Sequence, residues 1–164
     1  MNKVLQQTVD ALHEQYGDVV EQVYEFRDDV IVEIGRDAIV DVCRWLRDNE
    51  HCPFPLCEDV FGIDAWTRKN RFEVNYHFFS ITCKQRIHLK VRVEEQDPVI
   101  PTITGIYPAA DWYERETYDM YGITFSGHPD LRRAYMPEDF EYFPLRKDYP
   151  LMGIPGALPL PKRG

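Results

Sequence analysis

The 164-residue chain lacks the features by which several common classes of protein are identified. No stretch approaches the roughly 20 consecutive apolar residues that a membrane-spanning helix requires. The segment from Met1 to Glu14 lacks the apolar block and cleavage site of a secretory signal. A Gly-rich phosphate loop, a Ser nucleophile elbow and a dinucleotide-binding glycine pattern are also missing. We therefore expect a protein without a direct membrane span.

An excess of basic residues is missing as well. Lys and Arg number 19 against 28 Asp and Glu, which gives a formal net charge of −9. Proteins that bind phosphate backbones or anionic lipid surfaces present a basic footprint. The charge balance therefore argues against nucleic acid as a partner.

A regular spacing of cysteines is missing too. The four cysteines are Cys43, Cys52, Cys57 and Cys83, with no CxxC pair among them. This pattern favours four reduced thiols in a cytoplasmic protein. A zinc site that combines His51 with Cys43, Cys52 and Cys57 is the weaker alternative, because the spacing departs from the usual zinc ligand pattern.

The first two thirds of the chain show clear hydrophobic periodicity. Helical spacing predicts helices over 2–16 and 36–49, and alternation predicts strands over 19–26, 30–34, 60–66, 72–78 and 86–93. This order predicts an α+β domain over residues 1–106, a two-layer sandwich of a mixed sheet with helices on one face.

The remaining third, residues 107–164, has a different character. Half of the chain's aromatic residues lie between Tyr107 and Tyr149, and the pattern predicts one helix over 108–120 that ends at Gly122. No periodicity follows Gly122, and five prolines lie between Pro144 and Gly164. An aromatic segment without regular structure is typical of a surface completed by another protein. We expect a helix and a long extended tail that lies along a partner, not an independent domain.

The carboxylates of the predicted helix allow more than one interpretation. Arg115 and Asp119 are four residues apart and are expected to pair. Glu116 lies on an apolar stripe, where it either binds an arginine such as Arg132 or Arg133 or acts as a general acid with a raised pKa. With His128 and Asp130, Glu116 would form a stand-alone acid–base or metal-dependent hydrolase, although the spacing matches no metal-ligand frame.

One composite motif resembles a known family. It runs through Glu114-Arg115-Glu116-x-x-Asp119-Met120-Tyr121-Gly122-Ile123, Gly127-His128-Pro129-Asp130-Leu131-Arg132-Arg133, Pro137-Glu138-Asp139-Phe140-Glu141 and Pro144-Leu145-Arg146-Lys147-Asp148-Tyr149-Pro150. The motif resembles the C-type, thirty-kilodalton peripheral subunit of respiratory complex I, the proton-translocating NADH:quinone oxidoreductase. Residues 62–64 and 89–93 match the family more loosely.

The resemblance implies a non-catalytic subunit that supports assembly of the quinone-reducing module. It implies no catalytic residue, cofactor or metal in this chain, since NAD, FMN, iron–sulfur clusters and quinone belong to the whole complex. The implied partners are the D-type subunit and neighbouring iron–sulfur subunits, on the cytoplasmic side of the bacterial inner membrane. The implied partner interface comprises Glu114, Arg115, Glu116, Asp119, Met120, Gly122, His128, Pro129, Asp130, Arg132, Arg133, Pro137, Glu138, Asp139, Pro144, Leu145, Arg146, Lys147, Asp148 and Tyr149.

Related assemblies reuse this type of subunit with other electron donors. An equivalent subunit of a ferredoxin-linked or hydrogenase-type complex is therefore an alternative that the motif leaves open.

Overall fold

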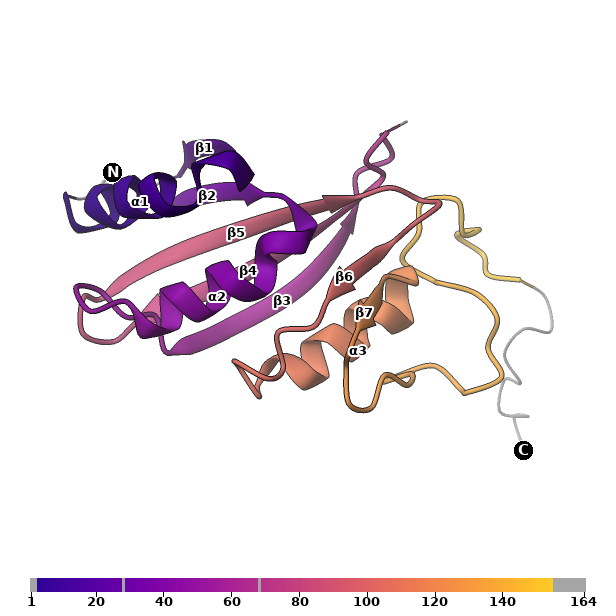
Figure 1. Cartoon of the computed structure of the whole chain (residues 1–164). Helices are drawn as coiled ribbons and strands as arrows, with labels where there is room; N and C mark the ends of the chain where they lie inside the picture. The colour runs from indigo at the N-terminus through magenta and orange to yellow at the C-terminus, as the bar shows by residue number, and fades with distance from the viewer. Residues whose placement is uncertain (1–2, 28, 68, 155–164) are drawn as a thin grey trace.

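A five-stranded mixed sheet forms the centre of the chain in the computed structural model, which describes residues 3–27, 29–67 and 69–154 (Figure 1). Its strands are β1 (Val20–Phe26), β2 (Asp29–Ile34), β3 (Leu56–Asp64), β4 (Phe72–Ser80) and β5 (Gln85–Val93). Their order is β1-β2-β5-β4-β3, and β2 and β5 are parallel whereas the other neighbours are antiparallel. The predicted mixed sheet is confirmed.

Two helices cover one face of this sheet (Figure 1). They are α1 (Lys3–Tyr16), which continues into a 3-10 turn over Gly17–Val19, and α2 (Ile39–Asp48), which follows a 3-10 turn over Arg36–Ala38. The apolar stripe of each helix is buried against the inward side chains of the strands, in one continuous core. The predicted two-layer α+β architecture is confirmed, although Asn2, where the first helix was expected to begin, lies outside the described residues.

The edge strand β3 begins at Leu56, four residues before the predicted start at Val60. An irregularity in its pairing with β4 between Cys57 and Asp59 shifts the register. Such a bulge interrupts the alternation of inward and outward side chains. The alternation was the only signal for this strand, so its first half could not be recognised.

The third helix, α3 (Ala110–Tyr121), packs against β3 at the edge of the sheet. Gly62 of β3 permits the contact, because a Cβ at this position would lie 2.7 Å from the Tyr121 ring and 3.0 Å from Thr117 Cγ2. The helix ends at Gly122, as predicted, with a φ of 74° that favours glycine. The edge strand β3 and α3 therefore pack together as one unit, which we call the platform.

A second, two-stranded parallel sheet joins β6 (Val99–Pro101) to β7 (Thr124–Ser126), on either side of α3 in sequence. The expectation of no regular structure beyond Gly122 was therefore wrong. Each strand has only three residues, too few for an alternating pattern to be recognised.

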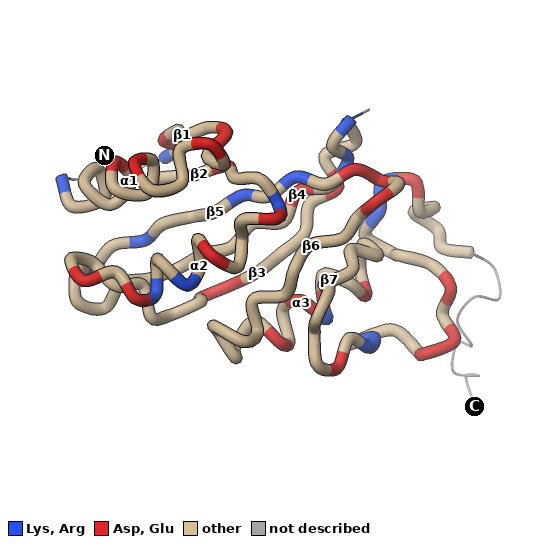
Figure 2. The backbone as a smooth tube through the Cα atoms, in the orientation of Figure 1, with Lys and Arg blue, Asp and Glu red and all other residues tan. Residues whose placement is uncertain are grey.

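Charged residues of both signs lie along the strands of the main sheet (Figure 2). Lys90 and Arg92 of β5 lie 3.2 Å and 2.9 Å from carboxylate oxygens of Glu73 on β4, and Arg92 also lies 3.0 Å from Glu33 on β2. The basic residues of β5 are thus neutralised within the sheet. Within the described part of the chain, no helix combines the length and the apolar character needed to cross a membrane.

The core contains two enclosed tyrosines with different hydrogen bonding. The Tyr107 hydroxyl donates to the Phe54 carbonyl at 2.8 Å and lies 3.3 Å from the Cys43 carbonyl, which ties the start of α3 to α2 and the loop after it. The Tyr76 hydroxyl on β4 is buried and has no partner among the described residues. Burial raises the pKa of both phenols, so both are neutral.

These two tyrosines form a matched pair for mutation. Tyr107→Phe is expected to lower the free energy of unfolding by about 1–3 kcal/mol, because it leaves a buried carbonyl without its donor. Tyr76→Phe is expected to leave stability unchanged or to raise it, because it removes a buried, unpaired hydroxyl. Urea unfolding of the two variants measures both, and equal losses would contradict the hydrogen-bond assignment.

Candidate functional site

The candidate site consists of α3 and the segment of residues 127–154 that follows β7, which we call the tail segment. It contains turns but no helix or strand, and it forms a wide arc beyond the end of α3 (Figure 1). A chain without its own ladder of hydrogen bonds needs other partners for its backbone groups. Buried side chains of the platform supply these partners.

Asp119 on α3 is the first of these anchors. It is fully buried, and its Oδ2 atom accepts the backbone N–H groups of Ala134, Tyr135 and Met136 at 3.1, 2.7 and 2.8 Å. Its Oδ1 atom lies 2.6 Å from Arg133 Nη1. Burial alone would raise the pKa of Asp119, but the Met136 and Tyr135 N–H groups and the Arg133 guanidinium outweigh it and lower that pKa. The carboxylate is therefore ionised and satisfied on both oxygens.

Asp64, at the end of β3, is the second anchor. It is 3% exposed, and its Oδ2 atom accepts the Lys147 N–H at 2.9 Å and lies 2.8 Å from Arg71 Nη2. Arg71 is itself buried, and its Nη2 atom lies 2.9 Å from Asp148 Oδ1. Although burial opposes ionisation of Asp64, the Arg71 guanidinium and the Lys147 and Trp66 N–H groups outweigh it and lower the pKa of Asp64. These ion pairs and the hydrogen bond from Lys147 thus hold residues 147 and 148 against the sheet edge.

Arg146 lies between these two anchors. Its Nε atom donates to the Tyr121 carbonyl at 2.6 Å, and its guanidinium lies over the Phe143 and Phe72 rings at 4.5 Å and 5.0 Å. A Cβ at Gly122 would lie 2.7 Å from Arg146 Nη2 and from the Phe143 ring. The end of α3 therefore accommodates the tail segment only because a glycine stands there.

Glu114 is a buried carboxylate of a different kind. It is fully buried, and it accepts the Thr102 hydroxyl and the Ile103 N–H, the latter at 2.9 Å. Burial raises the pKa of Glu114 to about 7, and the two donors offset that effect only in part. Glu114 thus connects α3 to the loop after β6, and it binds a proton more tightly in the folded chain than in the unfolded one.

The buried carboxylates differ from those expected. Asp119 pairs with Arg133 and not with Arg115, whose guanidinium lies over the Trp112 ring and donates to the Arg132 and Arg133 carbonyls. Glu116 is only half-buried, and its nearest donor is the Tyr135 hydroxyl at 3.4 Å. The predicted Arg115–Asp119 pair is therefore wrong. Of the two arginines expected for Glu116, Arg133 binds Asp119, which faces the incoming chain, and Arg132 binds Asp130.

The hydrolase constellation is not brought together. His128 Nδ1 accepts the Asp130 N–H at 3.1 Å, so its Nε2 atom carries the proton in the neutral ring. That atom faces Asp111, 3.2 Å from the carbonyl and 3.3 Å from Oδ1. The His128 ring is thus engaged by Asp111 and Asp130, whereas Glu116 faces the Tyr135 hydroxyl. Within the described residues, no group of three or more potential metal-ligating side chains was found.

The expected interface residues fall into three groups. The buried ones are Glu114, Arg115, Asp119 and Met120, and the half-buried ones are Glu116, Gly122, His128, Arg133, Pro144, Arg146 and Tyr149. The exposed ones are Pro129, Asp130, Arg132, Pro137, Glu138, Asp139, Leu145, Lys147 and Asp148. The buried members contact their own chain, and an interface with another protein stays a prediction for all three groups.

Sequence reasoning missed Asp64, Arg71 and Thr102 as partners of the motif. One signal could have revealed Asp64: it takes an inward position of β3, in step with Val60 and Gly62. An acidic residue at an inward position of a strand requires a buried cation or several donors. Arg71 and Thr102 lie in loops, where the sequence carries no comparable signal.

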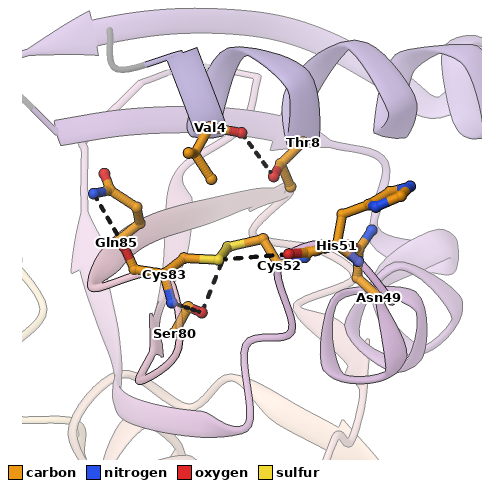
Figure 3. Close-up of a disulfide and its surroundings, with 8 residues drawn as sticks. All are labelled: Val4, Thr8, Asn49, His51, Cys52, Ser80, Cys83 and Gln85. Carbon is orange, nitrogen blue, oxygen red and sulfur yellow. Dashed lines mark hydrogen bonds between the residues drawn. A yellow bond between two sulfur atoms is a disulfide. The ribbon is translucent and has the colours of Figure 1, made fainter.

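Two of the four cysteines form a disulfide, between Cys52 and Cys83 (Figure 3). The expectation of four reduced thiols was therefore wrong. The two residues are 31 positions apart and meet because the loop after α2 lies against the turn between β4 and β5. Cys43 and Cys57 are free and buried, as expected of reduced thiols.

Comparisons with known proteins agree with the motif. The family model described as "Respiratory-chain NADH dehydrogenase, 30 Kd subunit" matches residues 32–155. The C-type subunit of NADH-quinone oxidoreductase from Roseiflexus sp. (strain RS-1) is 51% identical over 127 residues, which cover 77% of this chain and 73% of the relative. The same subunit from Salinispora arenicola is 43% identical over 153 residues, which cover 91% of this chain and 62% of the relative.

Two solved structures are similar as well. Nqo5, as its trypsin-resistant fragment 1–134, is 27% identical with a TM-score of 0.65, over 78% of this chain and 99% of the fragment. A chain of the membrane-bound sulfane sulfur reductase, an archaeal respiratory membrane complex, gives a TM-score of 0.74 at 24% identity, over 90% of this chain and 86% of that one. The second likeness concerns the fold alone.

The role of Asp119 can be tested against a matched control on the same helix. Asp119→Asn is expected to lower the free energy of unfolding by about 3–5 kcal/mol, because it leaves Arg133 and several N–H groups poorly paired in a buried site. Glu116→Gln is expected to change it by less than about 0.5 kcal/mol, as is usual for surface substitutions. Denaturant unfolding of both variants provides the measurement, and comparable losses would remove Asp119 as the anchor.

Glu114 predicts a pH dependence of stability. Its pKa is about 7 in the folded chain against an ordinary value of 4.5, so its contribution is fully present below about pH 4.5 and is lost as the pH rises through 7. The loss amounts to about 3 kcal/mol. Glu114→Gln, which cannot titrate, is expected to flatten the stability curve between these pH values, whereas Glu116→Gln should preserve it. An unchanged slope in Glu114→Gln would show that Glu114 is not the titrating group.

Proposed function

The chain belongs to the family of the 30 Kd subunit of respiratory-chain NADH dehydrogenase, and from this membership we propose that it works as the C-type subunit of a bacterial NADH-quinone oxidoreductase. In this role it is a peripheral, non-catalytic part of complex I, which passes electrons from NADH to quinone and translocates protons. The observation that carries the proposal is the match of the family model over residues 32–155. The curated relatives extend beyond the matched region, which spans 62–73% of their length in the two cases above.

A structural role in assembly agrees with the partners of the buried carboxylates, which lie within the chain itself. Asp119 and Asp64 are engaged with arginines and backbone N–H groups of their own chain. Glu114 is enclosed and bound to the Thr102 hydroxyl and the Ile103 N–H. Groups that perform acid–base chemistry must reach a substrate. We therefore propose that these carboxylates are structural and not catalytic. In keeping with this, we propose that NAD, FMN, iron–sulfur clusters and quinone are bound by other chains of the complex.

We propose that the tail segment contacts the D-type subunit and neighbouring iron–sulfur subunits. Its outer surface carries apolar side chains in water, with Tyr135, Leu145 and Leu151 exposed by 56%, 52% and 100%. Tyr135 lies edge-on to Trp112 of α3, which is itself 47% exposed. Aromatic and large apolar residues are enriched at the centres of protein interfaces. The anchors on the inner side would hold this surface in place for a partner.

The solved Nqo5 chain supports this view of the tail segment. It is a trypsin-resistant fragment, and it covers 78% of this chain. We propose that in this chain the part beyond about Pro144 is cut rapidly by protease when the chain is isolated, and that the partner protects it. The expected tail beyond residue 154 lies outside the described residues.

The proposed location is peripheral, on the cytoplasmic side of the bacterial inner membrane. An equivalent subunit of a ferredoxin-linked or hydrogenase-type complex is a less favoured alternative, because the curated relatives above are named as parts of an NADH-quinone oxidoreductase. The electron donor of the co-purifying complex distinguishes the two.

The proposal predicts that assembly can be lost without loss of folding. Leu145→Asp places a charge on the exposed tail surface and is expected to reduce co-purification of flavin- and cluster-containing subunits by tenfold or more, since unpaired charges at buried contacts cost about 2–5 kcal/mol. Phe26→Asp, at a site 59% exposed on β1, is the matched control and should leave co-purification unchanged. Affinity capture of each tagged variant from solubilised membranes provides the measurement, with NADH oxidation as a second readout.

The melting temperature of each isolated variant shows whether the fold is intact. Equal recovery of the complex with Leu145→Asp and with the unmodified chain would contradict the proposed tail contact. Capture of no flavin- or cluster-containing subunit by the unmodified chain would contradict membership of the complex.

A further inference from the structure

The Cys52–Cys83 disulfide lies far from the tail segment. It joins the loop after α2 to the turn between β4 and β5, at the end of the sheet near the N-terminus, whereas the tail segment leaves the opposite end (Figures 1 and 3). Neither cysteine belongs to the motif of α3 and the tail.

The two cysteines differ in accessibility. Cys52 is 1% exposed, whereas Cys83 is half-buried on the wall of an open groove of about 520 Å³ beside α1. Cys52, Thr8 of α1 and His51 of the loop after α2 also line this groove, but Cys52 presents almost no surface to solvent. Cys83 is therefore the more accessible of the two cysteines to a thiol that enters the groove.

Ser80 distinguishes the two sulfurs chemically. Its hydroxyl oxygen is buried, accepts the Cys83 N–H at 3.2 Å and lies 3.4 Å from Cys52 Sγ (Figure 3). A sulfur in a disulfide carries no proton, so in this contact the Ser80 O–H donates and Cys52 Sγ accepts. The same donor would stabilise Cys52 as a thiolate, because hydrogen bonds to charged acceptors are the stronger ones.

The backbone around each cysteine is held independently of the disulfide. The Asn49 side chain accepts the His51 and Cys52 N–H groups at 3.0 and 2.8 Å, and Ser80 holds the turn through Cys83. Both loops therefore keep their local hydrogen bonds when the sulfurs separate, so the bond can open and close again without refolding.

We propose that Cys52–Cys83 is a reversible thiol–disulfide exchange site, at which a low-molecular-weight thiol adds to Cys83. The thiolate of the small molecule forms a new bond with Cys83 Sγ, and Cys52 leaves with the electron pair of the broken S–S bond as a thiolate beside Ser80. A second small thiolate then attacks the added sulfur and releases Cys83 as a thiolate, together with the disulfide of the small molecule. The protein gains two electrons, and the reverse sequence closes the bond.

The other two cysteines provide internal controls. Cys43 is fully buried and Cys57 nearly so. Burial raises the pKa of Cys57 to about 12 and raises that of Cys43 well above its ordinary value, so both are protonated and unreactive in the folded chain. Modification at Cys43 or Cys57 would report unfolding.

Peptide mapping of the intact chain with glutathione as the probe tests the proposal. The chain is equilibrated with mixtures of reduced and oxidised glutathione, quenched with acid, alkylated and analysed by mass spectrometry. We expect the disulfide to be replaced by free thiols as the reduced form increases, and to return when the oxidised form is restored. The variant Cys52→Ser should retain one glutathionyl group on Cys83, whereas Cys83→Ser should carry roughly tenfold less on Cys52.

The Ser80→Ala variant tests whether the Ser80 hydroxyl stabilises the departing Cys52 thiolate. It is expected to slow opening of the disulfide by about tenfold, since a hydrogen bond to a charged atom has about that effect on a rate. Alkylation of reduced Cys83 by iodoacetamide should be unchanged, which separates this effect from a general loosening of the turn.

Three results would overturn the proposal. They are equal glutathionylation of Cys52→Ser and Cys83→Ser, a disulfide that neither opens in reduced glutathione nor re-forms in oxidised glutathione, and modification of Cys43 or Cys57 at the rate of Cys83. Each outcome is independent of whether the chain assembles with other subunits.

Discussion

The fold depends on buried carboxylates at the edge of the main sheet. Their hydrogen bonds come from backbone N–H groups of a segment that has no regular structure. Asp119 on α3 and Asp64 on β3 accept N–H groups from the tail segment, and Arg133 and Arg71 neutralise them. A buried carboxylate without these partners would cost several kcal/mol, and the tail backbone without them would lack hydrogen bonds. Each therefore requires the other, which explains why acidic helix residues and a proline-rich segment occur together in one motif.

This arrangement also separates the two surfaces of the tail segment. Its inner side is occupied by the contacts with α3 and β3, and its outer side presents apolar groups such as Leu145 to solvent. A binding surface held in place by its own domain loses less conformational entropy when a partner docks than a free peptide does. The chain is thus suited to contact other proteins, in agreement with a peripheral subunit of an oxidoreductase complex.

The sequence allowed the sheet, both covering helices and α3 to be predicted, because long elements with one buried face leave a clear period, as in β4 and β5. The prediction failed where the periodic signal is short or irregular. The strands β6 and β7 have three residues each, and a register shift hides the start of β3. Glu116 was expected to be the buried carboxylate of α3, whereas Glu114 and Asp119 are the buried ones. This prediction failed because a helical stripe does not show where a later, non-periodic segment will pack. The Cys52–Cys83 contact depends on two loops whose proximity only the complete fold determines.

Hydrogen–deuterium exchange of the purified chain and of the same chain within its isolated complex tests the central claim most directly. In the chain alone, the N–H groups of Ala134, Tyr135 and Met136 should already be protected by Asp119. Residues 138, 139 and 141–143, whose N–H groups have no such partner among the described residues, should exchange rapidly alone and become protected only in the complex. Rapid exchange at 134–136 in the isolated chain, or equal exchange of 138, 139 and 141–143 in both states, would contradict a tail that its own domain holds in place for a partner.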